Sequence, residues 1–246
     1  MLAKQEWFEV WFDSPYYHIL YDHRNEQEAE NFILNLKNHF QFSGKENVLD
    51  LACGAGRHAA FIAKFVKEVV GLDLSENSIQ QAKKTYPANN LEFYSHDMRL
   101  PFRMNYFNYI FNFFTSFGYF QTVSDNLKVL QSVHKGLKQN GILVLDFMNA
   151  QYTIKNLVKE ETIVKQGISF HIKREVKNRK ILKHISFSDK GKNYQFTESV
   201  QALFPADFME LLLKAGFVLI NEFGNYSLEP FQLKHSNRYI VIAKKK

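Results

Sequence analysis

The residues with the clearest chemical potential lie in the run DLACGAGR, which begins at Asp50. Gly54 and Gly56 stand between a predicted strand and a predicted helix, where the backbone must turn tightly and approach a ligand closely. The amide groups at such a helix start favour a negatively charged or electron-rich partner. Gly54, Gly56 and Ala59 also satisfy the G-x-G-x-x-G/A dinucleotide pattern. Taken alone, the turn leaves the ligand, or its absence, undecided.

Two further strand ends carry side chains that suit a nucleoside. Asp73 ends the second predicted strand, at about the distance beyond the glycines where an acid binds ribose hydroxyls. Asp97 and Met98 end the third strand, where an acid and an apolar side chain can flank an adenine. Each residue alone could be a helix cap, a turn acid or a core methionine. Because ligands bind at the carboxyl ends of parallel strands, their joint occurrence at three successive strand ends predicts a binding site.

Strands and helices alternate along the first part of the chain. Strands that alternate with helices of this length predict a parallel sheet with right-handed crossovers. A helix is expected between the last two strands of this part, with Gln139-Asn140-Gly141 as its C-terminal stop. The predicted strands are 47–52, 68–72, 91–94, 109–113 and 142–147, and the predicted helices are 58–67, 77–85 and 124–137.

The hydrophobic period changes to two after residue 150. Ile168, Phe170 and Ile172 alternate with polar residues, and the same period returns at 185–187 and 194–196. Turn signals at Lys177-Asn178 and Asp189-Lys190-Gly191 separate these runs, so we predict an antiparallel meander. The chain then returns to a helix at 205–215 and strands at 217–222 and 239–243.

The N-terminal part of the chain favours helices. A run of apolar residues at helical spacing extends from Ala29 to Phe40, with Asn25 as its predicted N-cap and Glu28 completing a capping box. A segment rich in tyrosine precedes this helix.

These motifs, taken in order, resemble those of a known family. DLACGAGR, GLDLSENSIQQAKK and SHDMRLPF resemble the first three motifs of class I S-adenosylmethionine methyltransferases, with Ala52 where glycine is commoner. FNYIFNFFTSFGYF and the stretch 137–147 resemble the segments at strands four and five. The resemblance covers 45–150 and, less distinctly, 203–246. It is specific to the superfamily and not to a substrate.

The resemblance implies an α/β fold with a Rossmann-like, mostly parallel seven-stranded sheet whose last strand is antiparallel. It also implies an N-terminal helical lid and an inserted antiparallel β-meander. We expect residues 1–42 to form the lid, 43–150 and 203–246 the cofactor-binding core, and 151–202 the inserted β region.

The cofactor that the resemblance implies is S-adenosyl-L-methionine. It assigns ten residues to this ligand: Asp50, Ala52 and Gly54 around the methionine moiety with Gly56 in the same turn, Asp73 at the ribose with Leu74 beside it, Asp97 and Met98 at the adenine, and Asn112 and Phe113 beside the sulfonium and the substrate channel.

The run 114–120 and the N-terminal tyrosine segment also resemble small-molecule N-methyltransferases of the amino-sugar type. We therefore expect methyl transfer to a small-molecule acceptor, at nitrogen rather than oxygen. A sulfonium is already an activated donor, so alignment of the acceptor supplies much of the rate. A hydroxyl acceptor needs a positioned base, whereas a neutral amine needs at most weak help. Candidate catalytic residues are Tyr17, Tyr21 and Tyr119, for which packing or a lid contact is the alternative reading.

The charge of the chain leaves other functions open. Residues 151–200 contain eleven Lys and Arg against five Asp and Glu, a net charge of +6, and the rest of the chain has twenty of each. Basic side chains on the predicted hairpin suit a solvated sheet edge, or a site for an acidic substrate or RNA phosphates. An RNA or tRNA methyltransferase is thus one alternative, and a non-catalytic cofactor-binding module is another. A nicotinamide oxidoreductase is the weakest, because Asp50 and Cys53 interrupt the apolar approach to the glycines.

Position in the chain predicts a role for the insertion at 151–202. It follows the fifth strand at the ligand-bearing end of the sheet, so we expect it to shape the acceptor pocket without being needed for cofactor binding. Composition excludes other classes. No apolar run approaches the roughly 20 residues that span a bilayer, and the N-terminus lacks the pattern of a signal peptide. Cys53 is the single cysteine, which excludes an internal disulfide. We expect a cytoplasmic monomer or homodimer without a metal ion.

Overall fold

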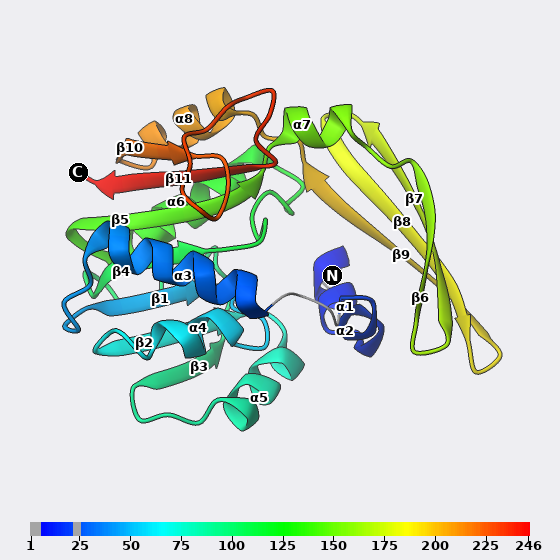
Figure 1. Ribbon diagram of the computed structural model, residues 1–246, viewed down its shortest axis with the longest axis horizontal. Helices are drawn as coiled ribbons and strands as arrows, with labels where there is room; N and C mark the ends of the chain where they lie inside the picture. The colour runs from blue at the N-terminus through cyan, green and yellow to red at the C-terminus, as the bar shows by residue number, and fades with distance from the viewer. Residues whose placement is uncertain (1–5, 22–25) are drawn as a thin grey trace, which may run out of the picture.

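The computed structural model describes residues 6–21 and 26–246. A seven-stranded sheet with helices on both faces forms its main body, and a second sheet lies beside it (Figure 1). The predicted N-cap Asn25 lies outside the described residues.

The main sheet has the strand order β10-β11-β5-β4-β1-β2-β3. Neighbouring strands from β5 through β3 are parallel, and β11 pairs antiparallel with both β5 and β10. The predicted fold class is confirmed, including the antiparallel last strand. The strands are β1 (Asn47–Leu51), β2 (Glu68–Asp73), β3 (Leu91–Ser95), β4 (Phe107–Asn112), β5 (Leu137–Met148), β10 (Phe217–Phe223) and β11 (Arg238–Lys245).

Two apolar clusters hold the helices against the two faces of this sheet. One face is covered by α3 (Glu26–Phe40), α4 (Arg57–Ile62) and α5 (Glu76–Thr85), and the other by α6 (Val123–Gly136) and α8 (Pro205–Lys214). α7 (Ala150–Lys155) leads from the main sheet into the second one.

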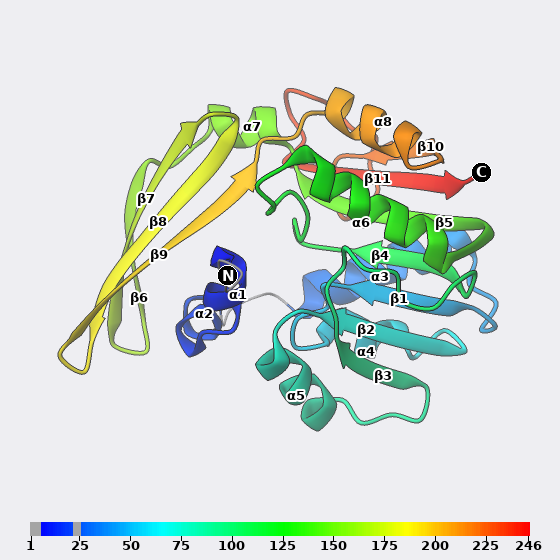
Figure 2. The same ribbon diagram turned by 180° about the vertical axis from the view of Figure 1, so that it is seen from behind.

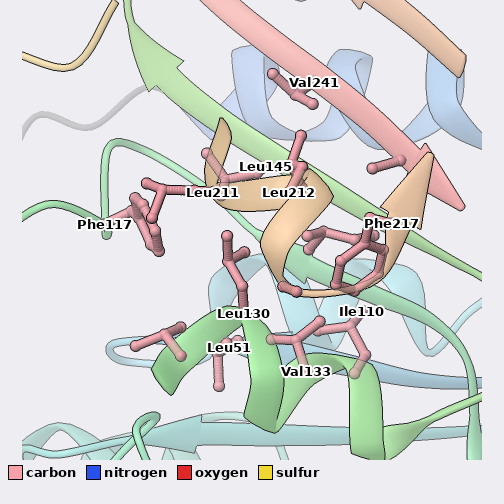
Figure 3. Close-up of a cluster of buried hydrophobic side chains, with 14 of the residues drawn as sticks. Leu51, Ile110, Phe117, Leu130, Val133, Leu145, Leu211, Leu212, Phe217 and Val241 are labelled. Carbon is pink, nitrogen blue, oxygen red and sulfur yellow. The ribbon is translucent and has the colours of Figure 1, made fainter. Parts of the chain in front are cut away.

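The cluster beneath α6 and α8 shows how the sequence periodicity is used. Leu130 and Val133 of α6 point toward Leu211 and Leu212 of α8 and toward the sheet (Figure 3). Leu130 and Val133 are three residues apart, and Leu211 and Leu212 are adjacent, so each pair lies on the buried face of its helix. A fully buried leucine contributes about 1.5–3 kcal/mol, so this cluster is a main source of the free energy of folding.

One predicted helix end is wrong, and one predicted stop signal lies elsewhere. α6 ends at Gly136, one residue before the predicted end, and Gln139-Asn140-Gly141 lies within β5. The amides of Asn105 and Tyr106 donate to the carbonyls of Lys135 and Gly136 at this helix end. α4 ends at Ile62 rather than at residue 67, because the amides of Lys67 and Glu68 donate to Glu46 and lead the chain into β2.

The second sheet is the predicted meander. Its order is β6-β7-β8-β9, all antiparallel, with β6 (Glu160–Lys165), β7 (Ile168–Lys177), β8 (Lys180–Asp189) and β9 (Lys192–Gln201). The turns after β7 and β8 have two successive residues at positive φ, as tight hairpins of type I′ require. β6 was not predicted from the sequence. The turn Gln166-Gly167 joins it to β7 and has the same geometry as the other two turns, with φ of 48° and 79°.

The N-terminal helices α1 (Trp7–Phe12) and α2 (Pro15–Leu20) lie between the carboxyl ends of the parallel strands and the meander (Figures 1 and 2). Trp11 and Leu20 are each 1% exposed, and they pack with Phe170 and Ile185 of the meander in one cluster. α1 and α2, which we call the lid, therefore touch both sheets.

The glycine turn before α4 yields a testable prediction. Gly56 has φ of +83°, and a Cβ there would lie 2.5 Å from the Phe93 ring, whereas a Cβ at Gly54, with φ of +55°, would meet nothing within 4 Å. Both alanine variants carry left-handed strain of about 1–2 kcal/mol. Only Gly56→Ala adds a steric clash, which should lower the free energy of unfolding by about 1–3 kcal/mol more. Urea unfolding should show the larger loss for Gly56→Ala, and equal losses would contradict the packing described.

Candidate active site

A cavity of about 740 Å³ opens where β1, β2, β3 and β4 end beneath the lid. The sheet places these strand ends at one edge, so residues far apart in the sequence meet there. Eleven of the predicted site residues line it: Tyr17, Tyr21, Asp50, Ala52, Gly54, Asp73, Leu74, Asp97, Met98, Phe113 and Tyr119.

The turn between β1 and α4 exposes backbone to the cavity. Ala52, Gly54 and Gly56 all have positive φ, of 61°, 55° and 83°. This conformation explains why glycine suits position 52 and why alanine is strained there. The space beside Gly54 is open, so a ligand can approach the main chain closely at that point.

Asp50 is the most unusual side chain in the cavity wall. It is 1% exposed, and its Oδ2 atom has no hydrogen-bond partner among the described residues. Burial raises the pKa of the carboxyl to about 7, and the nearby charge of Asp73 adds to the increase. A buried carboxylate is stable only beside a cation or hydrogen-bond donors, so this position favours a positively charged ligand group.

Asp73 joins two loops at the cavity edge. Its carboxylate accepts hydrogen bonds from the amides of Gly54, at 2.8 Å, and Ser75, at 2.9 Å. Burial nevertheless raises the pKa of Asp73 above its ordinary value. The same side chain can thus hold the glycine turn and offer its remaining lone pairs to a ligand.

Asp97 is part of a chain of charges that reaches the lid. Arg99 donates to both carboxylate oxygens of Asp97 and, at 2.9 Å, to Glu6. Burial opposes ionisation of Asp97, but the bonds from Arg99 hold its pKa below the ordinary value. Met98 beside it lines the cavity. The sequence predicted Asp97 but not Arg99, whose partner Glu6 is 93 residues away.

Two predicted residues do not line the cavity. Gly56 packs behind it, against Phe93. Asn112 is 2% exposed and donates from Nδ2 to the carbonyl of Leu51, at 2.9 Å, and to that of Ser116, at 3.3 Å. In the structure Asn112 ties β1 to the loop that follows β4.

That loop, residues 113–120, is fixed by a buried ion pair. Phe114 and Thr115 have positive φ, of 56° and 61°. Asp146, which is 0% exposed, accepts from the Phe114 amide at 2.8 Å and from Nε of Arg238 at 2.7 Å. Arg238 also donates to the Thr115 hydroxyl at 3.1 Å. These bonds hold Phe114 in the cavity wall, with the Arg57 guanidinium 5.4 Å from the centre of its ring.

One face of α1 closes the cavity, as expected of an N-terminal helical lid, but the sequence reasoning did not name the residues of α1 that line it. Phe8, Glu9, Phe12 and Asp13 all line it. The signal was present, because Trp7-Phe8-Glu9 recurs four residues later as Trp-Phe-Asp, one helical turn on. Asp13 accepts from the Ser75 hydroxyl at 2.7 Å, which fixes the end of α1 to the start of α5.

The three candidate tyrosines have different surroundings. The Tyr21 hydroxyl donates to Glu198 at 2.7 Å and accepts from Nζ of Lys183 at 2.5 Å. Tyr17 and Tyr119 both pack edge-on or tilted against Phe12, with ring centres 5.0 and 5.3 Å away. Tyr21 is therefore bound to the meander, and the other two belong to an aromatic wall.

Comparison with known proteins identifies the family. The family described as "Methyltransferase domain" matches residues 42–201. This chain belongs to the methyltransferase domain family. A Geobacillus sp. (strain WCH70) protein named as a methyltransferase is 26% identical over 63% of this chain, and the chain spans only 61% of that protein. A Streptomyces venezuelae dTDP-3-amino-3,4,6-trideoxy-alpha-D-glucopyranose N,N-dimethyltransferase is 26% identical over 64% of this chain and 68% of its own length.

A solved structure shows the same fold. An S-adenosylmethionine-dependent methyltransferase from Clostridium acetobutylicum superposes with a TM-score of 0.79 at 17% identity, over 94% of this chain and 96% of that one. The predicted recognition as a class I methyltransferase is confirmed. S-adenosylmethionine, which the name of this neighbour specifies, remains the predicted cofactor of this chain.

The cavity of this methyltransferase fits that cofactor. S-adenosylmethionine carries an ammonium, a sulfonium and a ribose diol. The unpaired Oδ2 atom of the buried Asp50 suits a cationic group, and the open space at Gly54 admits a ligand against the backbone. The contacts assigned to single residues stay a prediction. Cys53 is buried, and burial raises the pKa of its thiol well above the ordinary value, which disfavours the reactive thiolate form.

The expected role of the meander needs correction. None of residues 151–202 lines the cavity that the described chain forms. The lid lies between them, and the meander holds the lid. Glu198 accepts from the Trp11 indole at 2.7 Å, and Asp189 accepts from the Tyr16 hydroxyl at 2.8 Å.

Two other features concern the described residues only. They contain no group of three or more His, Cys, Asp or Glu side chains that could hold a metal ion. None of their helices combines the length and the apolar character needed to cross a membrane.

Replacement of Asp73 tests the cofactor site. Asp73→Ala removes a carboxylate whose charge-assisted hydrogen bonds contribute about 1.5–3 kcal/mol each, so the affinity for S-adenosylhomocysteine should fall at least about tenfold. Calorimetric titration measures the loss. Thr122→Ala, which removes the N-cap of α6 away from the cavity, is the matched control. Equal affinities of the two variants would show that Asp73 only caps and braces the loops.

Proposed function

We propose that this methyltransferase transfers the methyl group of S-adenosylmethionine to a nitrogen atom of a small-molecule acceptor. The main support for this proposal comes from the lid. It closes the cavity with Phe8, Glu9 and Phe12, side chains that suit a compact ligand with an amine.

The size and closure of the cavity support a small acceptor. Its volume of about 740 Å³ lies within the usual 300–1,000 Å³ or so of small-molecule pockets. The bonds from Ser75 to Asp13 and from Arg99 to Glu6 tie the lid down at two points.

The basic residues of the meander offer little support for an RNA substrate. Lys173 pairs with Glu160 at 3.0 Å, and Arg179 pairs with Asp207 at 2.7 Å. Arg174 pairs with Glu161. Binding to RNA phosphates depends on cations that are available to the backbone of the nucleic acid. The pairs instead support the alternative reading of this surface as a solvated sheet protected by charge.

Nitrogen is favoured by the chemistry of the wall. When bound, S-adenosylmethionine supplies a methyl group on an activated sulfonium. The acceptor amine must lose one proton and then use its lone pair to form the N–C bond, while the S–C bonding electrons stay on sulfur. Carboxylates such as Glu9 can receive that proton or pass it to water, and Phe113 and Phe114 exclude solvent. The Streptomyces venezuelae relative, which is named as an N,N-dimethyltransferase, supports the same choice.

The remaining alternatives are less consistent with this arrangement. A cofactor-binding module without catalysis would need no enclosed space beside the cofactor, yet the aromatic wall of Phe12, Tyr17 and Tyr119 forms one. The buried, single Cys53 supports a cytoplasmic location as part of this proposal.

Transfer of an isotopic label tests the function. The protein is incubated with S-adenosylmethionine labelled in the methyl group, together with either the small-molecule fraction or the total RNA of a cell extract. Label should enter small molecules that a cation exchanger retains, because a methylated amine keeps its positive charge. Asp73→Ala should reduce this incorporation. Label that enters RNA, or only neutral and acidic small molecules, would contradict the proposal.

A further inference from the structure

The cavity has the opposite charge to the rest of the protein. The chain carries a formal net charge of +6. Among the described residues that line the cavity, however, Arg57 is the single Lys or Arg side chain. The carboxylates that line it are Glu9, Asp13, Glu26, Asp50, Asp73, Glu76 and Asp97.

Charges next to the wall do not correct this excess. Arg99 lies beside the cavity but is paired with Asp97 and with Glu6. Lys183 reaches the Tyr21 hydroxyl, which donates to Glu198 on its other side. His18, His58 and His96 also line the cavity and count as neutral in the formal charge. The cofactor, with one carboxylate and two cationic groups, adds a single positive charge, so the formal charge left for the acceptor is negative.

The position of the acids divides them between two ligands. Asp50, Asp73 and Asp97 lie at the ends of β1 and β2 and just beyond β3, where we place the cofactor. Asp13 is used by Ser75 and by Asn77, at 2.7 and 2.8 Å. Glu26 and Glu76 are exposed in the first turns of α3 and α5. Glu9 remains on the lid side.

Glu9 shares the cavity wall with aromatic side chains. Phe8, Phe12 and Tyr119 line the same cavity, and the Phe12 ring packs against Tyr119 with centres 5.3 Å apart. A cavity lined by a carboxylate and by aromatic rings is a favourable environment for an organic cation.

We propose that the acceptor is a cationic amine without a phosphate group, and that its ammonium binds to Glu9 between the aromatic rings of the lid wall. This inference rests on the proposed function and specifies its substrate class. It also separates this chain from its Streptomyces venezuelae relative, whose name specifies a dTDP-linked sugar. A diphosphate needs several cations or backbone donors, whereas Arg57 alone faces this cavity and packs on the Phe114 ring.

Matched ligand pairs test the charge of the acceptor. The protein saturated with S-adenosylhomocysteine is titrated with 2-phenylethylamine against 3-phenylpropionate, and with glucosamine against glucosamine 6-phosphate. Thymidine diphosphate is the fifth probe. Each amine should bind at least about tenfold more tightly than its anionic partner, and thymidine diphosphate should not bind. Equal or tighter binding of an anionic partner, binding of thymidine diphosphate, or binding of neither amine would overturn the inference.

Replacement of Glu9 tests the anchor. Glu9→Gln keeps an acceptor oxygen for the Glu6 amide, which closes the capping box of α1, but removes the charge. KM for the preferred amine should rise at least about tenfold, while the affinity for S-adenosylhomocysteine stays unchanged. Glu210→Gln, which removes an exposed charge on α8, is the control and should change neither. An unchanged KM in Glu9→Gln would exclude Glu9 as the anchor.

Different results would contradict the proposed function and the inferred substrate class. If the protein does not bind S-adenosylhomocysteine, the proposed function itself is wrong. If it binds this ligand but prefers phosphorylated partners, the methyltransferase function stands and the inferred substrate class is wrong.

Discussion

A buried carboxylate with an incomplete set of partners is the constraint around which this cavity is organised. The Oδ2 atom of Asp50 has no hydrogen-bond partner among the described residues, and Arg57 only partly offsets the effect of burial. Asp50 is placed at the end of β1 by the parallel sheet, and the packing that excludes water from it raises its pKa to about 7. Because this value lies above the ordinary 3.8, the folded chain favours the protonated carboxyl. Asp50 therefore lowers the stability of the ligand-free protein as the pH rises from about 3.8 to about 7. A cationic ligand reverses that cost, which makes the destabilised residue useful for binding.

The surrounding structure preserves this arrangement. The hydrogen bond from the Gly54 amide to Asp73 holds the glycine turn against β2, and the Asp146–Arg238 pair holds Phe114 in the opposite wall. The lid excludes water from above, and the meander, through Glu198, fixes the lid. A meander that does not line the cavity thus still acts on it, through the residues that it holds in place.

The sequence predicted what local signals determine. Glycines, strand-end acids and alternating apolar residues identified β1 to β5, the turns of the meander and eleven of the residues that line the cavity. The missed features are long-range: Asp146 and Arg238 are 92 residues apart, and Trp11 and Glu198 are 187 apart. No local pattern marks such pairs, because the contact exists only once the sheets are assembled. The end of α4 at Ile62 was missed for the same reason, since the amides of Lys67 and Glu68 after it donate to the carbonyl of Glu46.

Proton exchange on cofactor binding tests this account most directly. S-adenosylhomocysteine is titrated calorimetrically at about pH 6, where its amino group is already protonated, in buffers of different ionisation enthalpy. If the ligand cation drives ionisation of Asp50, binding should release up to about one proton in the parent protein and clearly less in Asp50→Asn. Binding without proton release, or with the same release in both proteins, would contradict the claim that an uncompensated buried carboxylate defines the site.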